Sequence, residues 1–409
     1  MINYEEIIKI TKYELKGELP DTFRFENGER VKTRADWERR RQEIYKKAVD
    51  LQFGTIPTEK PDVFRVEPTY LGGKHRPNSY RIIAGTKEKQ LSFTMYVFKA
   101  ETAKKTPMVI TGDLCFPYPF DTKFIDVFLN SGIGLVAFNR TELAPDIAEY
   151  NFKPLIDGSG EKSLAKEVFD ELDNTLNCGG PLKEIYPEYT FGAIGAWAWG
   201  YSRCVDALEL LGIADMEHIA FTGHSRGAKT AALAGVIDER AFLVNPNATC
   251  AGGCSCYRVS IEAITEDGDI KPSEPISNIL NVFPAWMGEK MHKYSDKEEL
   301  LPFDSHDFKA LVAPRILFVS EAASDIWSNP VGSYQTTEAA AEVYKFLGCE
   351  ENLLWYFRRG YHYQKYEDIE MLVNIINNRI NSEPLSDKFF KLPFKPIEKA
   401  YSWKCPEVE

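Results

Sequence analysis

The chain has 409 residues, enough for two or three typical domains or for one large domain with insertions. It is 44% hydrophobic, 27% charged and 13% aromatic, a globular composition that excludes wholesale disorder, collagen and coiled coil. Lys plus Arg at 49 against Asp plus Glu at 61 give a net charge of −12, which would repel phosphate backbones and anionic membrane surfaces. We therefore expect neither nucleic acid nor a membrane as a partner.

The first twenty residues lack the basic segment and apolar run of a secretory signal. This predicts a cytoplasmic protein, or a secreted one if a leader precedes the sequence. The eight cysteines are spread thinly, as is typical of reduced thiols. They cluster only at Cys250, Cys254 and Cys256. No second pair of Cys or His residues stands at the spacing of a zinc ribbon, so we expect these three cysteines to pack a glycine-rich turn.

Residues 1–105 are expected to form a helix and antiparallel strands packed on the same domain as the rest. Residues 33–51 combine a polar N-cap with apolar residues at helical spacing, which predicts an amphipathic helix. Residues 62–100 alternate between polar and apolar, most clearly at 91–98. Because successive strand side chains face opposite ways, this alternation predicts antiparallel strands.

From residue 106 to 409, short apolar runs alternate with helical stretches, which predicts an α/β fold with a mainly parallel central sheet flanked by helices. The expected strands are 108–111, 134–138, 219–222, 242–245, 316–320 and 353–357. The expected helices are 197–211, 228–236, 337–347 and 368–380. Residues at about 249–307, rich in Gly, Pro and aromatics, are expected to be an insertion at one end of the sheet.

Residues 223–227 read Gly-His-Ser-Arg-Gly and lie between an expected strand and an expected helix. In that context G-x-S-x-G is the nucleophile elbow of an α/β-hydrolase fold. The turn is too tight for a Cβ at the glycines, and it lifts Ser225 Oγ clear of the sheet at a helix N-terminus, which favours developing negative charge. This predicts Ser225 as a nucleophile, with an ordinary glycine turn as the alternative.

A serine nucleophile needs a base and an orienting acid, which follow it in the order acid, then histidine. Of the six histidines, three precede or adjoin the serine and a fourth lies in the presumed insertion. His362 follows the last strand, where this fold carries its base, so we expect it to be the base and His306 to bond local backbone. For the acid, Asp325 is the first choice and Glu321 the reserve, and either could instead be a solvated loop carboxylate.

The oxyanion also needs donors, and the backbone N–H of Arg226 is expected to be one. A second is expected near Gly112 and Asp113, after the strand at 108–111. The Arg226 side chain is a further candidate, and Lys229, one helical turn beyond the serine, can reach the same mouth. The alternative for both cations is an exposed position at the start of the helix.

Residues 223–229 resemble the Gly-Cys-Ser-Arg-x-Gly-Lys signature of carbohydrate esterase family 15, the glucuronoyl esterases, with His224 in place of Cys and Ala228 in place of Gly. The resemblance extends over roughly residues 190–380. It is carried by Phe-Pro-Ala-Trp at 283–286, Leu-Pro-Phe-Asp-Ser-His at 301–306, Ala-Leu-Val-Ala-Pro-Arg at 310–315 and Asp-Ile-Trp at 325–327. Many members place the catalytic acid after the strand that follows the elbow, but residues 244–248, which correspond to that position, carry no acid. Some bacterial members place the acid after the penultimate strand instead, and that position points to Asp325.

The family hydrolyses esters between the 4-O-methyl-glucuronic acid of xylan and lignin alcohols, by a metal-free serine mechanism. The resemblance implies Ser225 as nucleophile, His362 as base, Arg226 as oxyanion stabiliser, Lys229 as a contact to sugar hydroxyls, Trp327 as an aromatic wall and Trp286 as a further substrate-binding residue.

We therefore expect a serine carbohydrate esterase that acts on a glucuronoxylan-derived ester through an acyl-enzyme. The alternatives are an acetyl-xylan or cephalosporin-type deacetylase, and a catalytically silent carbohydrate-binding homologue. No metal or organic cofactor is expected, because the sequence holds no ligand cluster or nucleotide fingerprint. The sequence leaves open the oligomeric state, the alcohol released, and whether the substrate is a polymer or an oligosaccharide.

Overall fold

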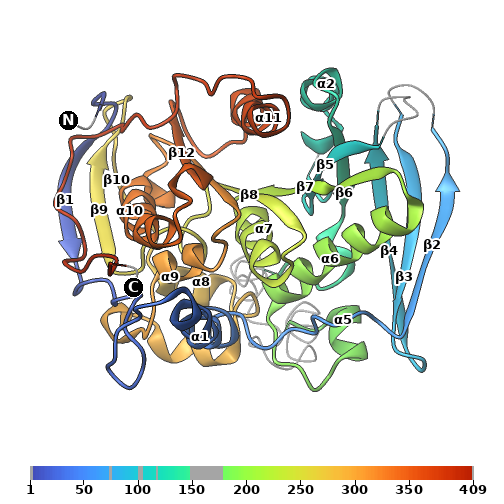
Figure 1. Cartoon of the computed structure of the whole chain (residues 1–409), viewed down its shortest axis with the longest axis horizontal. Coiled ribbons are helices and arrows are strands. Elements are labelled where there is room, and N and C mark those ends of the chain that lie inside the picture. The colour runs from blue at the N-terminus through green and yellow to red at the C-terminus, as the bar shows by residue number, and fades with distance from the viewer. Residues whose placement is uncertain (1–2, 73–75, 100–104, 117, 148–177, 408–409) are drawn as a thin grey trace, which may run out of the picture.

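The apolar runs of the sequence become neighbouring strands of one sheet in the computed structural model, which describes residues 3–72, 76–99, 105–116, 118–147 and 178–407. Nine strands lie in the order β12-β11-β8-β7-β5-β6-β4-β3-β2 (Figure 1). The six from β12 to β6 pair in parallel. They are β5 (Thr106–Thr111), β6 (Gly134–Phe138), β7 (Ala214–His224), β8 (Ala241–Asn247), β11 (Ile316–Ala322) and β12 (Leu353–Arg358). Each contains an expected strand, and the α/β fold is confirmed.

Three antiparallel strands extend this sheet at its other edge. They are β2 (Val63–Tyr70), β3 (Asn78–Gly85) and β4 (Gln90–Phe98). In β4 buried residues alternate with half-buried ones, as the polar and apolar alternation predicts. Residues 63–98 therefore share the central sheet with the rest of the chain.

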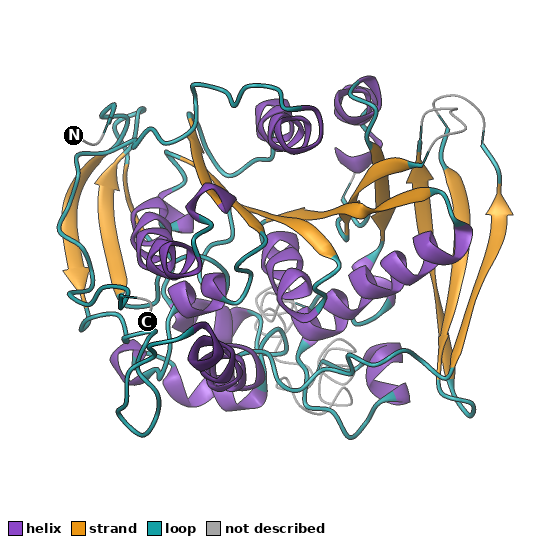
Figure 2. Cartoon of the chain, viewed as in Figure 1, coloured by secondary structure: helices purple, strands orange, loops and turns teal. Residues whose placement is uncertain are grey.

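Helices cover both faces of the sheet (Figure 2). One face packs against α2 (Thr122–Asn130) and α11 (Tyr366–Asn381). The other packs against α6 (Ala193–Leu211), α7 (Arg226–Ile237) and α10 (Pro330–Leu347), with α1 (Arg34–Tyr45), α5 (Gly180–Ile185), α8 (Ile276–Val282) and α9 (Ser305–Ala310) on the same side. Helix α6 is buried from residue 193 to residue 208, because it is apolar on nearly every side. None of the helices in the described ranges is long and apolar enough to cross a bilayer.

Two features of the N-terminal region differ from expectation. The helix expected at 33–51 is α-helical only to Tyr45 and continues as a π-helical segment, Lys46–Leu51. Thr33 caps it, since its hydroxyl accepts from the Asp36 N–H at 3.1 Å. The chain start also forms an unexpected strand, β1 (Lys9–Leu15), which pairs with β9 (Val259–Ile264). With β10 (Ile270–Pro272), these strands form a second sheet, which joins the chain start to the presumed insertion.

The sheet brings together segments that lie far apart in the sequence. Strands β7, β8, β11 and β12 are adjacent and parallel, so their carboxyl ends lie at one edge. Parallel sheets of this kind place binding and catalytic residues in the loops at that edge. The loops there carry Ser225, Asp325 and His362.

Candidate active site

Ser225 lies at the sharp turn between β7 and α7. Its backbone has φ 56° and ψ −121°, an uncommon conformation for a residue with a Cβ. The two flanking glycines are required: a Cβ on Gly223 would lie 2.3 Å from the Gly227 carbonyl oxygen, and one on Gly227 would lie 1.9 Å from an Asp113 carboxylate oxygen. The turn is held by Ser225 N–H donating to the Asn247 carbonyl at 3.0 Å.

A hydrogen-bonded chain runs from Ser225 through His362 to Asp325. His362 Nε2 lies 2.9 Å from Ser225 Oγ, and His362 Nδ1 lies 2.6 Å from Asp325 Oδ2. Asp325 is buried at 4% exposure, whereas the His362 side chain is 38% exposed. This is the arrangement in which an imidazole accepts a serine proton and a buried carboxylate stabilises the imidazolium that forms.

Neither Glu321, the reserve acid, nor His306 takes part in this hydrogen-bonded chain. Glu321 is fully buried, and its carboxylate accepts from Ser333 Oγ at 2.9 Å and Ser328 Oγ at 3.2 Å rather than from His362. Burial raises the pKa of Glu321 above its usual value. His306 is also buried, and its Nε2 bonds the carbonyl of Pro20, which is distant in sequence rather than local as expected.

Arg226 is fixed beside the nucleophile by three side chains. Its guanidinium donates to both carboxylate oxygens of Asp146, at 3.1 and 3.2 Å. It also lies 4.9 and 4.7 Å from the ring centroids of Phe283 and Trp286. Trp286 Nε1 donates to the same Asp146 carboxylate at 3.1 Å. A guanidinium held on a carboxylate and two rings is preorganised, so it need not reorient when negative charge develops nearby.

The expected backbone donors differ in their availability. Arg226 begins α7, so its N–H lies in the first helical turn, whose donors have no intrahelical acceptor. Gly112 N–H instead donates to the Tyr201 hydroxyl at 2.8 Å, and Asp113 N–H faces Thr111 Oγ1 at 3.3 Å. Neither of these two N–H groups is therefore free for the oxyanion, and a second donor elsewhere in the loop near them stays a prediction. The Asp113 carboxylate accepts the backbone N–H of His224 at 2.8 Å and pairs with Arg140.

Lys229 does not reach the mouth of the site. It is 2% exposed, its ammonium donates to the Thr249 carbonyl, and its aliphatic chain packs under Gly252 and Gly253. The expectation of a Lys229 cation at the mouth of the site is therefore wrong. The Lys229 side chain starts in the first turn of α7 and runs inward beneath the 249–253 loop. The ammonium lies 6.0 Å from the centroid of the Trp286 ring.

The two expected aromatic contacts are exposed to different extents. Trp327 is 41% exposed, and its ring is accessible to a ligand. Trp286 is 3% exposed and stacks on Phe283 with centroids 3.8 Å apart and planes 12° apart. Because Phe283 and Arg226 already lie against Trp286, this residue supports the guanidinium rather than offering an open face to a sugar.

Three groups at the site had no role predicted from the sequence, although one of them lies within the elbow motif. Asp146 is one. Glu274 is another: its N–H donates to the Trp327 carbonyl at 3.0 Å, its carboxylate accepts from Asn278 at 2.9 Å, and burial raises its pKa while Lys229 opposes the rise. The third is the side chain of His224.

His224 packs its ring against His362, with centroids 4.7 Å apart. Its Nδ1 lies 2.7 Å from Asn247 Oδ1, and Asn247 donates in turn to Ser320 Oγ at 2.9 Å. Burial, and then the proximity of His362, lower the pKa of His224 to about 4. A neutral imidazole therefore supports the ring of His362 at ordinary pH.

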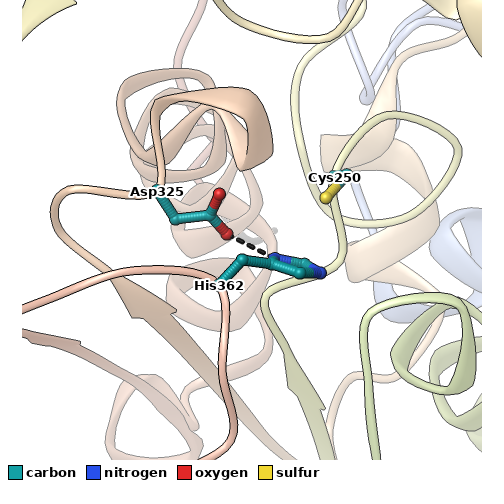
Figure 3. A group of neighbouring side chains, drawn as sticks. All are labelled: Cys250, Asp325 and His362. Atoms are coloured by element: carbon teal, nitrogen blue, oxygen red, sulfur yellow. Dashed lines mark hydrogen bonds and ion pairs between the residues drawn. The ribbon is translucent and has the colours of Figure 1, made fainter. Parts of the chain in front are cut away.

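The three clustered cysteines are buried free thiols, as expected, at or near a turn that contains Gly252 and Gly253. Cys250 faces the Asp325–His362 pair (Figure 3). One sulfur, one carboxylate oxygen and one imidazole nitrogen of these residues lie within 4.8 Å of one another.

Comparisons with known proteins agree with this geometry. A family model described as fungal glucuronyl esterase matches residues 165–348. The 4-O-methyl-glucuronoyl methylesterase of Hypocrea jecorina is 28% identical over 343 residues, which cover 82% of this chain and 64% of that protein. That of Wolfiporia cocos is 28% identical over 340 residues, 81% of this chain and 73% of that protein.

A solved structure covers nearly the whole of this chain. The carbohydrate esterase family 15 glucuronoyl esterase of Caldicellulosiruptor kristjansonii superposes with a TM-score of 0.76 at 25% identity, covering 97% of this chain and 98% of that chain. The matches span less than two thirds of the length of two of these relatives: 64% of the Hypocrea jecorina protein and 62% of the Podospora anserina methylesterase. The family model, the curated relatives and the solved structure agree in one respect: this chain is similar in sequence and fold to the glucuronoyl esterases of carbohydrate esterase family 15.

Proposed function

We propose that this protein is a serine esterase that hydrolyses glucuronoyl esters, with a 4-O-methyl-glucuronate ester of xylan as the substrate class. The observation that carries the proposal is the chain of hydrogen bonds from Ser225 through His362 to Asp325, beside the clamped guanidinium of Arg226. The relatives named as 4-O-methyl-glucuronoyl methylesterases support the choice of substrate.

The reaction follows from the positions of the protons. His362 Nε2 accepts the proton of Ser225 Oγ as the oxygen attacks the ester carbonyl, and Asp325 stabilises the imidazolium. The N–H and guanidinium of Arg226 stabilise the tetrahedral oxyanion. The alcohol then leaves with the proton from His362, and a water molecule deprotonated by the same imidazole releases the uronic acid.

The sugar would be held by groups of opposite character. The exposed ring of Trp327 offers an apolar face for a pyranose ring. Glu274, whose N–H donates to the Trp327 carbonyl at 3.0 Å, is half-buried beside this ring and offers a carboxylate to a sugar hydroxyl.

The test is steady-state hydrolysis of benzyl glucuronate beside p-nitrophenyl acetate, with wild type and Ser225→Ala in parallel. We expect a Ser225-dependent kcat/KM that strongly favours the glucuronate. Activity on the acetate alone would make the protein a deacetylase, and inactivity on both would make it a silent homologue. The cytoplasmic location stays a prediction, which fractionation of the native host would test.

A further inference from the structure

The thiol of Cys250 has no part in the proposed ester hydrolysis, yet it is directed at the catalytic pair. Figure 3 shows its sulfur turned toward the carboxylate of Asp325 and the ring of His362. Cys250 has φ 55°, and its N–H donates to Ser328 Oγ at 3.1 Å. This hydrogen bond fixes the loop that presents the sulfur. Cys250 is 5% exposed, so the sulfur lies under the site rather than in solvent.

From this juxtaposition we propose that Cys250, Asp325 and His362 form an inhibitory binding site for Zn²⁺ or a similar thiophilic divalent cation. Sulfur, nitrogen and oxygen from these three residue types are the donors that zinc prefers. A tetrahedral zinc with bonds of about 2.0 to 2.3 Å holds its ligand atoms roughly 3.5 Å apart. The three atoms already lie within 4.8 Å of one another, so modest side-chain rotations complete the set.

The charges around the site suit a cation with one thiolate ligand. Asp325 supplies one negative charge and a bound Cys250 thiolate a second, which together balance the metal. The thiol gives up its proton to water when the metal binds, and the imidazole binds through its lone pair while keeping its one proton on the other nitrogen.

A metal at this position would stop catalysis. His362 is the group that must accept the Ser225 proton, and its hydrogen bond to Asp325 holds it in the right tautomer. Coordination by His362 and Asp325 removes one or both of these functions. The metal is therefore an inhibitor here and not a cofactor, and entry is open from the half-exposed side of His362.

The first experiment titrates Zn²⁺ against the hydrolysis of benzyl glucuronate, a readout that rests on the proposed function. We expect inhibition that EDTA reverses, and a Cys250→Ser variant that keeps its activity but needs at least about tenfold more zinc for half inhibition. Cys254→Ser is the matched control, because Cys254 is a buried thiol of the same loop and should leave zinc sensitivity unchanged. Equal zinc sensitivity in wild type and Cys250→Ser would overturn the proposal.

The second experiment does not depend on esterase activity. Co²⁺ added to the wild-type protein should give a near-ultraviolet thiolate-to-cobalt charge-transfer band. The band should vanish in Cys250→Ser, or in Cys250→Ala if the serine variant is unfolded by circular dichroism. It should persist in Cys115→Ser, which removes an exposed thiol. A wild type without the band, or a band that survives the loss of Cys250, would refute the site even in a fully active esterase.

Discussion

Replacing Asp325 by asparagine changes one charge at the end of the hydrogen-bonded chain. The carboxylate accepts the Nδ1–H of His362 at 2.6 Å and is 4% exposed, so little solvent can substitute for it. An asparagine amide can donate instead, which would leave Nδ1 as an acceptor and place the ring proton on Nε2. That proton would then point at Ser225 Oγ, and the imidazole could no longer accept the serine proton.

The size of the effect follows from this change of tautomer and from the loss of the charge that stabilises the imidazolium. Loss of the carboxylate from a comparable triad lowers kcat by about 10⁴-fold. At about 1.4 kcal/mol for each factor of ten, this corresponds to roughly 5 kcal/mol of transition-state stabilisation. We expect a loss of this size in kcat, with little change in KM, because Asp325 does not contact the substrate.

The assay is steady-state hydrolysis of benzyl glucuronate, with Glu321→Gln as the matched control. Glu321 lies within β11, four residues before Asp325, and burial raises its pKa and so favours the neutral acid, which a glutamine matches in shape and charge. We expect Glu321→Gln to keep kcat within a few-fold of wild type. An Asp325→Asn variant within about tenfold of wild type would refute the role of Asp325 as the triad acid.

Three further predictions concern the oxyanion site, acid stability and the elbow. Arg226→Lys should lower kcat by about 10²- to 10³-fold in the same assay, because an ammonium cannot bond Asp146 in two places while donating to the oxyanion. An unchanged kcat would show that the guanidinium does not stabilise the transition state. The pKa of His224 is about 4 in the folded protein and about 6.5 in the unfolded chain. The free energy of unfolding should therefore decrease by up to about 3 kcal/mol as the pH falls from 6.5 to 4, because the unfolded chain takes up the proton first. Urea unfolding at pH 5 and pH 7.5 should therefore show a smaller acid loss for His224→Gln than for wild type, and equal losses would contradict the shift. Gly227→Ala should destabilise the fold by about 3 kcal/mol in thermal unfolding, because the new Cβ would meet the buried Asp113 carboxylate. The control Gly268→Ala has open space around it and should lose only about 1 kcal/mol of stability. Similar losses in the two variants would contradict the close approach of Gly227 to Asp113.

Local sequence was sufficient for the elements whose signals are local. Parallel strands buried on both faces read as short apolar runs, so all six parallel strands of the central sheet could be predicted. The elbow could be predicted for the same reason, because a strand, two glycines and a helix start are adjacent in the chain. Strand β1 could not: Lys9–Leu15 is largely exposed, and its partner β9 lies about 250 residues away.

The site itself depended on pairings between distant segments. Asp325 and Glu321 are four residues apart and chemically alike, and the sequence could only rank them. Glu321 is the sixth residue of β11 and turns toward Ser333 in the interior, whereas Asp325 follows the strand in a loop that meets His362. The direction of each carboxylate is set by the strand and the loop together.

Short-range patterns of residues were enough to predict the fold class, the elbow and the order of nucleophile, acid and base. Tertiary structure decided the acid, the burial of Lys229, the clamp of Asp146 on Arg226 and the contact between His224 and His362. These four depend on which loops the parallel strands bring to one edge of the sheet. The physical reason is that a side chain's partner is fixed by packing across the fold, which a linear pattern of residues does not encode.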